Sequence, residues 1–273
     1  MNPTAARTIL AVGALLLGWC VGSFVNVLIY RLPRGRSVVV PGSHCFCCGT
    51  LLAARDNIPL LSYLLAGRRC RYCGVALSGQ YLWVEALTGV LFVAIFWRWD
   101  LTLTTLTYWV AAAALVAGTG TDLRYKIIPD GLNITVLVAA LLGAWAGGRW
   151  PLLAGDGLPP LVWSVAGAVL GWLIFEAIVR LSRWWLGQEG MGGGDVLLAA
   201  GVGALFGPTA QFGAFFLLSI FAGVLIGGGL MALGRVSRRD PIPFGPFLVA
   251  GTLAVMLWPE IGDWVARLYG LGG

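Results

Sequence analysis

Long apolar runs separated by short polar segments dominate the chain. Eight such runs occur, roughly at 8–30, 81–99, 101–120, 132–146, 161–180, 196–206, 212–233 and 247–258. Runs that are apolar on all sides predict helices buried in a bilayer. Because a perpendicular span needs about 20 residues, we expect the shorter runs to be tilted, re-entrant or extended by their neighbours.

The composition supports a membrane protein. Hydrophobic residues make up 59% of the 273 residues and charged residues 11%, whereas soluble domains carry about 25% charged residues. Forty glycines and thirteen tryptophans fit close helix packing in lipid and the membrane interface. The first run is too long for a signal peptide and lacks a cleavage site, so we expect a retained helix. The predicted fold class is an all-α, polytopic membrane bundle of about eight transmembrane helices.

The basic residues predict the orientation. With eight spans, fourteen lysines and arginines fall on one side of the membrane and four on the other. Basic loops stay in the cytoplasm, which places segment 31–80 inside and both termini outside. The basic residues are spread over several loops rather than gathered in one stripe with aromatic residues, so nucleic acid is not an expected partner.

Segment 31–80 contains five of the six cysteines. Cys45 and Cys48 form one C-x-x-C unit, and Cys70 and Cys73 form another, with 21 residues between the two units. Two such units supply the four thiolates of a tetrahedral zinc site. Disulfides or unrelated free thiols are the alternatives; a reducing cytoplasm disfavours disulfides, and paired C-x-x-C spacing is unusual by chance. With four protein ligands, the zinc would be structural and would hold together a loop that lacks an apolar core.

Two other residues could compete as zinc ligands. Cys47 lies inside the first C-x-x-C unit, and His44, the only histidine, is adjacent to it. Cys20 belongs to the first apolar run, where a small buried thiol needs no further role.

Two aspartates lie at ends of apolar runs. Asp122 emerges from the third run, and Asp195 follows a glycine-rich segment at the start of the sixth. An ionisable group at such a depth is a candidate functional residue. The charge pattern puts both on one side of the membrane, where a carboxylate pair sharing a proton could activate water and polarise a peptide carbonyl. Gly192, Gly193 and Gly194 would let a substrate backbone approach Asp195.

Structural roles compete with this interpretation. Asp195 could cap its helix, and Asp122 could pair with Arg124 or Lys126. The glycine segment is not a P-loop, because no Lys-Ser/Thr follows it, and no H-E-x-x-H motif occurs. Glu85 and Glu176 lie in apolar runs, where they could bond to neighbouring helices or line a cavity.

The ordered motifs resemble those of the type IV prepilin leader peptidases over nearly the whole chain. They comprise Gly22–Val27 with Tyr30–Pro33, the two C-x-x-C units, Asp56–Leu64, Val84–Gly89, Asp122–Asp130, Gly190–Asp195 and Ile242–Phe247. The resemblance implies that Asp122 and Asp195 are the catalytic pair of a G-x-G-D intramembrane aspartyl protease. It also implies that Cys45, Cys48, Cys70 and Cys73 bind zinc.

The resemblance further implies the reaction. Prepilins or pseudopilins of pili and type II secretion would lose a short leader at the cytoplasmic face of the bacterial inner membrane. The new N-terminus would then be methylated by S-adenosylmethionine, for which no binding residue is identified. Two positions depart from the family pattern: Phe46 replaces a common proline, and Leu197 replaces a common lysine.

These inferences give a domain division and a rival function. We expect a first transmembrane helix at 1–30, a zinc-binding loop domain at 31–80 and a protease core at 81–273. The rival is a non-enzymatic membrane component that binds partners of a pilus or secretion assembly through its zinc loop.

Overall fold

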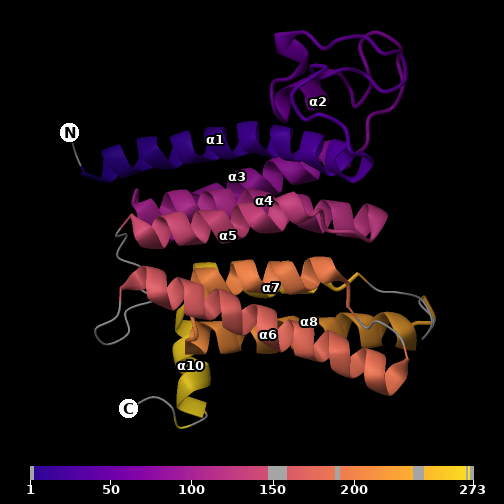
Figure 1. Ribbon diagram of the computed structural model, residues 1–273. Coiled ribbons are helices and arrows are strands. Elements are labelled where there is room, and N and C mark those ends of the chain that lie inside the picture. The colour runs from indigo at the N-terminus through magenta and orange to yellow at the C-terminus, as the bar shows by residue number, and fades with distance from the viewer. Residues whose placement is uncertain (1–2, 147–158, 188–190, 236–242, 269, 271–273) are drawn as a thin grey trace. The chain divides into compact units, whose positions relative to one another are not determined.

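The computed structural model describes residues 3–146, 159–187, 191–235, 243–268 and 270. Within these ranges the regular structure is helical, with two isolated β-bridges in the cysteine-rich loop (Figure 1). The helices are α1 (Pro3–Arg31), η1 (Leu32–Arg34), η2 (Ala54–Asp56), α2 (Leu61–Leu65), α3 (Gln80–Trp99), α4 (Leu103–Tyr125), α5 (Asp130–Trp145), α6 (Pro160–Leu186), α7 (Gly193–Phe206), α8 (Ala210–Ala232), α9 (Gly245–Leu257) and α10 (Glu260–Leu268).

Each of the eight apolar runs forms a helix, which confirms the all-α membrane fold. Among the described residues, α1, α3, α4, α6 and α8 are long and apolar enough to cross a membrane, and α9 with α10 would make six. Helices α5 and α7 contain 16 and 14 residues. At 1.5 Å per residue they are about 24 and 21 Å long, less than the roughly 30 Å of a bilayer core. The expected count of about eight spans therefore depends on these shorter helices.

The chain forms two compact units, Met1–Leu101 and Thr102–Gly273. In the first unit, α1 packs along α3. Their backbones approach closely: a Cβ on Gly18 would lie 2.7 Å from the Gly89 Cα, and one on Gly22 would lie 2.7 Å from the Glu85 Cα. Small residues permit such crossings in lipid, where close packing replaces the hydrophobic effect as the attraction between helices.

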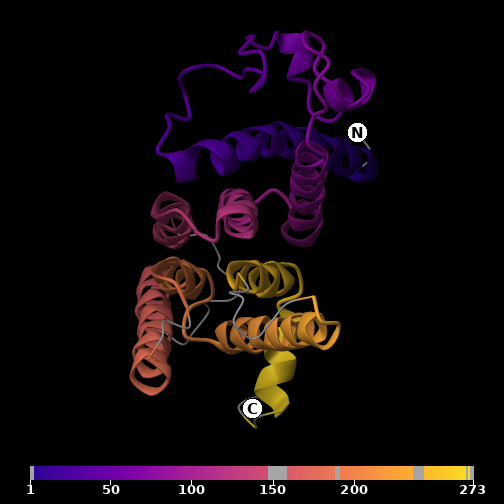
Figure 2. The ribbon, with the colours of Figure 1, turned by 90° about the vertical axis from the view of Figure 1, so that its right-hand side faces the viewer.

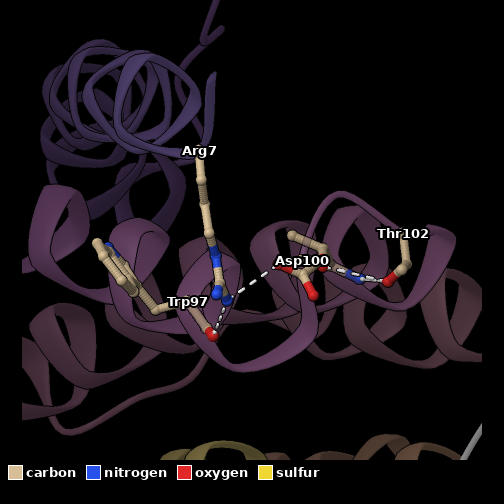
Figure 3. Close-up of polar contacts among 5 residues, drawn as sticks. Arg7, Trp97, Asp100 and Thr102 are labelled. Atoms are coloured by element: carbon tan, nitrogen blue, oxygen red, sulfur yellow. Dashed lines mark hydrogen bonds and ion pairs between the residues drawn. The ribbon is translucent and has the colours of Figure 1, made fainter. Parts of the chain in front are cut away.

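Arg7 joins the beginning of α1 to the end of α3 (Figure 3). Its guanidinium donates to the Trp97 carbonyl at 3.0 Å, lies 3.0 Å from an Asp100 carboxylate oxygen, and lies 5.2 Å from the centre of the Trp97 ring. The Arg7 and Asp100 side chains are 44% and 69% exposed. A pair this exposed contributes about 0–1 kcal/mol, so the contact orients the helix ends more than it stabilises the fold.

In the second unit, α7 packs against α5 and α6, while α9 packs against α4 and α8 (Figure 2). The α6–α7 crossing relies on glycine, because a Cβ on Gly167 would collide with the Gly203 carbonyl and one on Gly171 with the Ala199 carbonyl. Helix α10 leaves α9 at 100°, and Pro259 lies at this bend because a proline cannot continue the backbone hydrogen bonding of α9.

Candidate active site and metal site

Asp122 lies in the last turn of α4. The helix ends at Tyr125 and is capped by Lys126, which adopts the left-handed conformation (φ 57°) and donates its N–H to the Asp122 carbonyl. The Asp122 side chain is buried, and its carboxylate oxygen Oδ2 accepts a hydrogen bond from the Gly245 N–H at 3.0 Å. Asp122 is thus held by the first residue of α9, which is 123 positions away in sequence.

Asp195 lies in the first turn of α7 and is also buried. Its Oδ2 accepts the N–H of Gly192 at 3.2 Å, and its own N–H donates to the Gly192 carbonyl at 3.0 Å. Gly192 rather than Asp195 is the N-cap residue of α7, and Asp195 stands at the third position of the helix, where its carboxylate accepts the N-cap N–H. This contact is compatible with a catalytic role. The positive end of the helix dipole favours a carboxylate at this position, and the hydrogen bond fixes the direction of the carboxylate.

The helix ends that carry the two aspartates meet around Ile128, in the segment that follows α4. Ile128 contacts both Gly194, which precedes Asp195, and Gly245, which donates to Asp122. A Cβ on Gly194 would lie 3.1 Å from the Ile128 carbonyl oxygen, and one on Gly245 would lie 2.7 Å from the Ile128 Cδ1. The starts of α7 and α9 thus both contact the segment that follows α4.

The three glycines expected to admit substrate differ in their surroundings. A Cβ on Gly193 would meet nothing within 4 Å, whereas Gly194 is packed tightly against Ile128. Gly192 has φ −80° and ψ 158°, which any residue can adopt. The open space at Gly193 fits the expected approach of a substrate backbone to Asp195. At Gly194, a glycine is needed because the residue packs tightly against Ile128. Gly190, the first glycine of the G-x-G-x-G-D segment, lies outside the described residues.

Three residues of this site were not singled out by the sequence. Gly245 occurred only as part of a motif, Ile128 as one apolar residue of a polar segment, and Asn133 as a position within an apolar run. The Asn133 side chain is 1% exposed and donates to the Gly194 carbonyl at 2.9 Å. A buried amide in an apolar run was the available signal, because such a group must find a partner.

The four predicted cysteine ligands converge. The sulfur atoms of Cys45, Cys48, Cys70 and Cys73 all lie within 4.8 Å of one another, and those of Cys45 and Cys73 are 3.8 Å apart. A tetrahedral zinc with bonds of about 2.3 Å places its sulfurs about 3.8 Å apart. The four sulfur donors and their spacing therefore fit a tetrahedral zinc ion. Four protein ligands would leave no open coordination position for a catalytic water.

The two C-x-x-C units fold in the same way. Gly49 and Gly74 each follow the second cysteine with φ +70° and +72°, and each donates its N–H to the first cysteine's carbonyl at 2.9 Å. This left-handed conformation favours glycine. Isolated bridges, His44 with Leu51 and Arg69 with Ala76, close the two turns.

The two possible competing ligands lie outside the cluster. Cys47 is exposed, and His44 Nδ1 donates to the Gly42 carbonyl at 3.0 Å; neither belongs to the group of converging sulfurs. Hydrogen bonds from the side chain and backbone of Thr50 lower the pKa of Cys48 to about 6. Burial and hydrogen bonds with the other three cysteines instead raise the pKa of Cys73 to about 12.

Glu85 ties the cysteine-rich loop to α3. Its carboxylate accepts the Leu60 N–H at 2.7 Å, and Leu60 adopts a positive φ of 59°. Glu176 instead pairs with Arg180 on the same helix at 2.8 Å. The sequence left open a bond to neighbouring helices or a place lining a cavity; the Leu60 contact of Glu85 is a third option, a bond to a loop backbone within the same unit.

A pocket of about 340 Å³ lies at the end of α1 and is lined by Tyr30, Arg31, Arg36, Ser37, Val40, Pro41 and His44. S-adenosylmethionine carries a sulfonium and an ammonium cation, which need acidic or aromatic partners. The lining offers the aromatic ring of Tyr30 but holds two arginines and no carboxylate, so it supplies no counter-charge for either cation of this cofactor.

Two family models match the chain. The bacterial peptidase A24 N-terminal domain matches residues 16–99, and the type IV leader peptidase family matches residues 109–228. The chain belongs to the type IV leader peptidase family. Residues 16–99 contain all four clustered cysteines, and residues 109–228 contain both aspartates.

Curated relatives support this membership across most of the chain. Proteins of Aeromonas salmonicida and Xanthomonas campestris pv. campestris, each named "Prepilin leader peptidase/N-methyltransferase", are 34% and 33% identical over 93% of this chain and 91% and 94% of their own. The protein of the same name from Pseudomonas aeruginosa is 31% identical over 93% and 91%. No solved structure matches. The chain is accordingly a peptidase and a multi-pass membrane protein.

Proposed function

We propose that this peptidase removes the leader of type IV prepilins or of type II secretion pseudopilins, with Asp122 and Asp195 as its catalytic pair. One observation carries the proposal: two buried carboxylates, at the end of α4 and the start of α7, each accept a backbone N–H, and the starts of α7 and α9 both pack against Ile128, six residues after Asp122. The family membership gives the reaction class, and the names of the relatives give the substrate class.

The chemistry follows from two carboxyl groups that share one proton. The ionised member takes a proton from a water as that water attacks the scissile carbonyl. The protonated member donates a hydrogen bond to the carbonyl oxygen and later supplies the proton that the leaving amine needs. The Gly245 and Gly192 N–H groups hold the carboxylates in place, and open space at Gly193 admits the substrate backbone. We assign neither aspartate a fixed role, because a coupled pair titrates as a unit.

The location of the reaction follows from charge. Segment 31–80 holds seven arginines and one acidic residue, a strong signal for retention in the cytoplasm. We propose that this segment and the aspartate pair face the cytoplasm and that the protein lies in the bacterial inner membrane.

The names of the relatives also include N-methyltransferase. We propose that the enzyme also methylates the new N-terminus after cleavage, with S-adenosylmethionine as the methyl donor. When bound, it would supply the methyl group to the free amine. None of the residues described above is assigned to this step.

The aspartate pair is tested by Asp122→Asn and Asp195→Asn in purified enzyme, reconstituted with a prepilin and labelled S-adenosylmethionine. Each substitution removes one carboxyl of the pair, so we expect cleavage to fall at least 10³-fold. Asp130→Asn is the matched control: Asp130 is exposed in the first turn of α5, and normal cleavage is expected. Undiminished cleavage by either pair variant would refute the dyad, whereas absence of cleavage by the unsubstituted protein would favour the non-enzymatic assembly component. Methyl transfer to the cleaved product is a separate readout, and its absence with intact cleavage limits the function to proteolysis.

We propose that Cys45, Cys48, Cys70 and Cys73 bind one structural zinc that stabilises segment 31–80. Metal analysis should give about one zinc per chain, and Cys70→Ser should lower it because three thiolates bind zinc less tightly than four. Cys47→Ser is the control, since Cys47 lies outside the cluster, and its zinc content should be unchanged. Equal zinc loss in both variants would contradict the assigned ligand set.

A further inference from the structure

The pocket at the end of α1 holds a buried arginine without a carboxylate partner. Arg31 is 6% exposed, and its guanidinium donates to the Ser37 carbonyl at 3.0 Å and the Gly42 carbonyl at 3.1 Å. These bonds use part of the five N–H donors of a guanidinium and neutralise none of its charge. A buried cation is costly unless a counter-charge is near.

The acidic residues of this unit are engaged elsewhere. Residues 1–101 contain three acidic side chains, Asp56, Glu85 and Asp100. Asp56 accepts from Tyr72 at 2.8 Å and lies 3.3 Å from Arg71. Glu85 accepts the Leu60 N–H, and Asp100 pairs with Arg7. The counter-charge for Arg31 therefore has to come from outside this unit.

The lining supplies donors for an anion. Arg36, an exposed residue, adds a second guanidinium at the pocket. The Ser37 hydroxyl oxygen accepts the N–H groups of Val39 and Val40, both at 3.2 Å, which leaves the hydroxyl proton free to be donated. Two guanidinium forks and a hydroxyl suit a phosphate, whose oxygens accept paired N–H bonds.

The position of the pocket indicates the source of the phosphate. Arg31 is the last residue of α1, and the membrane-span candidate that includes α1 ends at Arg34. Val39 and Val40, beside the pocket, are 77% and 69% exposed. Basic pockets with an apolar margin at the end of a span are suited to anionic lipid headgroups. We propose that this pocket binds the phosphate of an anionic phospholipid through Arg31 and Arg36.

The test uses the purified full-length protein in neutral detergent and calorimetric titration with short-chain phosphatidylglycerol. Arg36→Gln should weaken binding about tenfold, as expected for the loss of one charge-assisted bond to phosphate. Arg55→Gln is the matched control: Arg55 is an exposed arginine of the same loop outside the pocket, and its loss should change affinity less than twofold. Unchanged zinc content and helicity identify variants that keep their fold.

Two results would overturn the proposal. Equal weakening by Arg36→Gln and Arg55→Gln would mean that the whole basic loop attracts the lipid and the pocket does not. Inorganic phosphate is titrated in parallel, and we expect it to bind at least tenfold more weakly than phosphatidylglycerol. If it binds as tightly, free phosphate is the ligand and the lipid assignment fails. Neither result depends on peptide cleavage, so this test is independent of the proposed peptidase site.

Discussion

At the scale of residues, both candidate catalytic aspartates accept N–H groups at the starts of helices. Asp195 belongs to the first turn of α7 and accepts from Gly192. Asp122 lies near the end of α4, where the helix dipole disfavours a negative charge. The Gly245 N–H at the start of α9 compensates for this position. Gly245 of α9 thus orients the Asp122 carboxylate, which the dipole of α4 disfavours.

We predict that Gly245→Ala abolishes most cleavage. A Cβ at this position would lie 2.6 Å from Asp122 Oδ2 and 2.7 Å from Ile128 Cδ1, so the carboxylate must move. A displacement of about 1 Å typically costs about 10²-fold in rate. The measurement is the initial rate of prepilin cleavage. Gly228→Ala is the control, because an added Cβ there meets nothing within 4 Å. Equal activity of the two variants would show that Gly245 does not position Asp122.

The sequence predicted those site residues that are close to one another along the chain. Two C-x-x-C units identified the converging cysteines, since each unit folds through its own glycine turn. The contact between Gly245 and Asp122 spans 123 positions, and neither residue type indicates it. The Asn133 bond to the Gly194 carbonyl likewise depends on how α5 meets α7, which hydrophobic pattern alone does not determine.

At the scale of elements, the apolar runs predicted helix positions better than helix ends. Each apolar run became a helix. Helix α10 was missed because charged residues interrupt its sequence, leaving no apolar run. An amphipathic helix of nine residues gives a weak signal when only continuous apolar runs are counted.

The α6–α7 crossing leads to a prediction about stability. In Gly167→Ala the new Cβ would collide with the Gly203 carbonyl and lie 2.5 Å from the Gly207 Cα. Backbone atoms cannot move aside as a flexible side chain can, so we expect a loss of about 1–3 kcal/mol. The measurement is the unfolding temperature in detergent. Gly213→Ala, which adds a Cβ in open space on α8, should leave it nearly unchanged. A Gly167→Ala variant as stable as the Gly213→Ala variant would show that the helices separate without cost.

At the scale of the whole molecule, the net charge of +6 comes from residues 1–101. Residues 1–101 hold nine arginines and three acidic residues, whereas residues 102–273 hold nine basic and nine acidic residues. Most of the excess lies in segment 31–80, and none of it in the part that carries the aspartates. The charge rule therefore orients the protein chiefly through the cysteine-rich loop.

Cys47 provides a test of that orientation. It is exposed and lies outside the four-cysteine cluster, so with zinc bound it is the reactive thiol of the loop. If segment 31–80 is cytoplasmic, a membrane-impermeant maleimide should label Cys47 in inverted inner-membrane vesicles and in spheroplasts only after lysis. Cys47→Ser should remove the label in both preparations, which separates Cys47 from Cys20 in α1. Labelling of intact spheroplasts would reverse the orientation. It would also move the proposed lipid pocket, which adjoins this loop, to the outer leaflet.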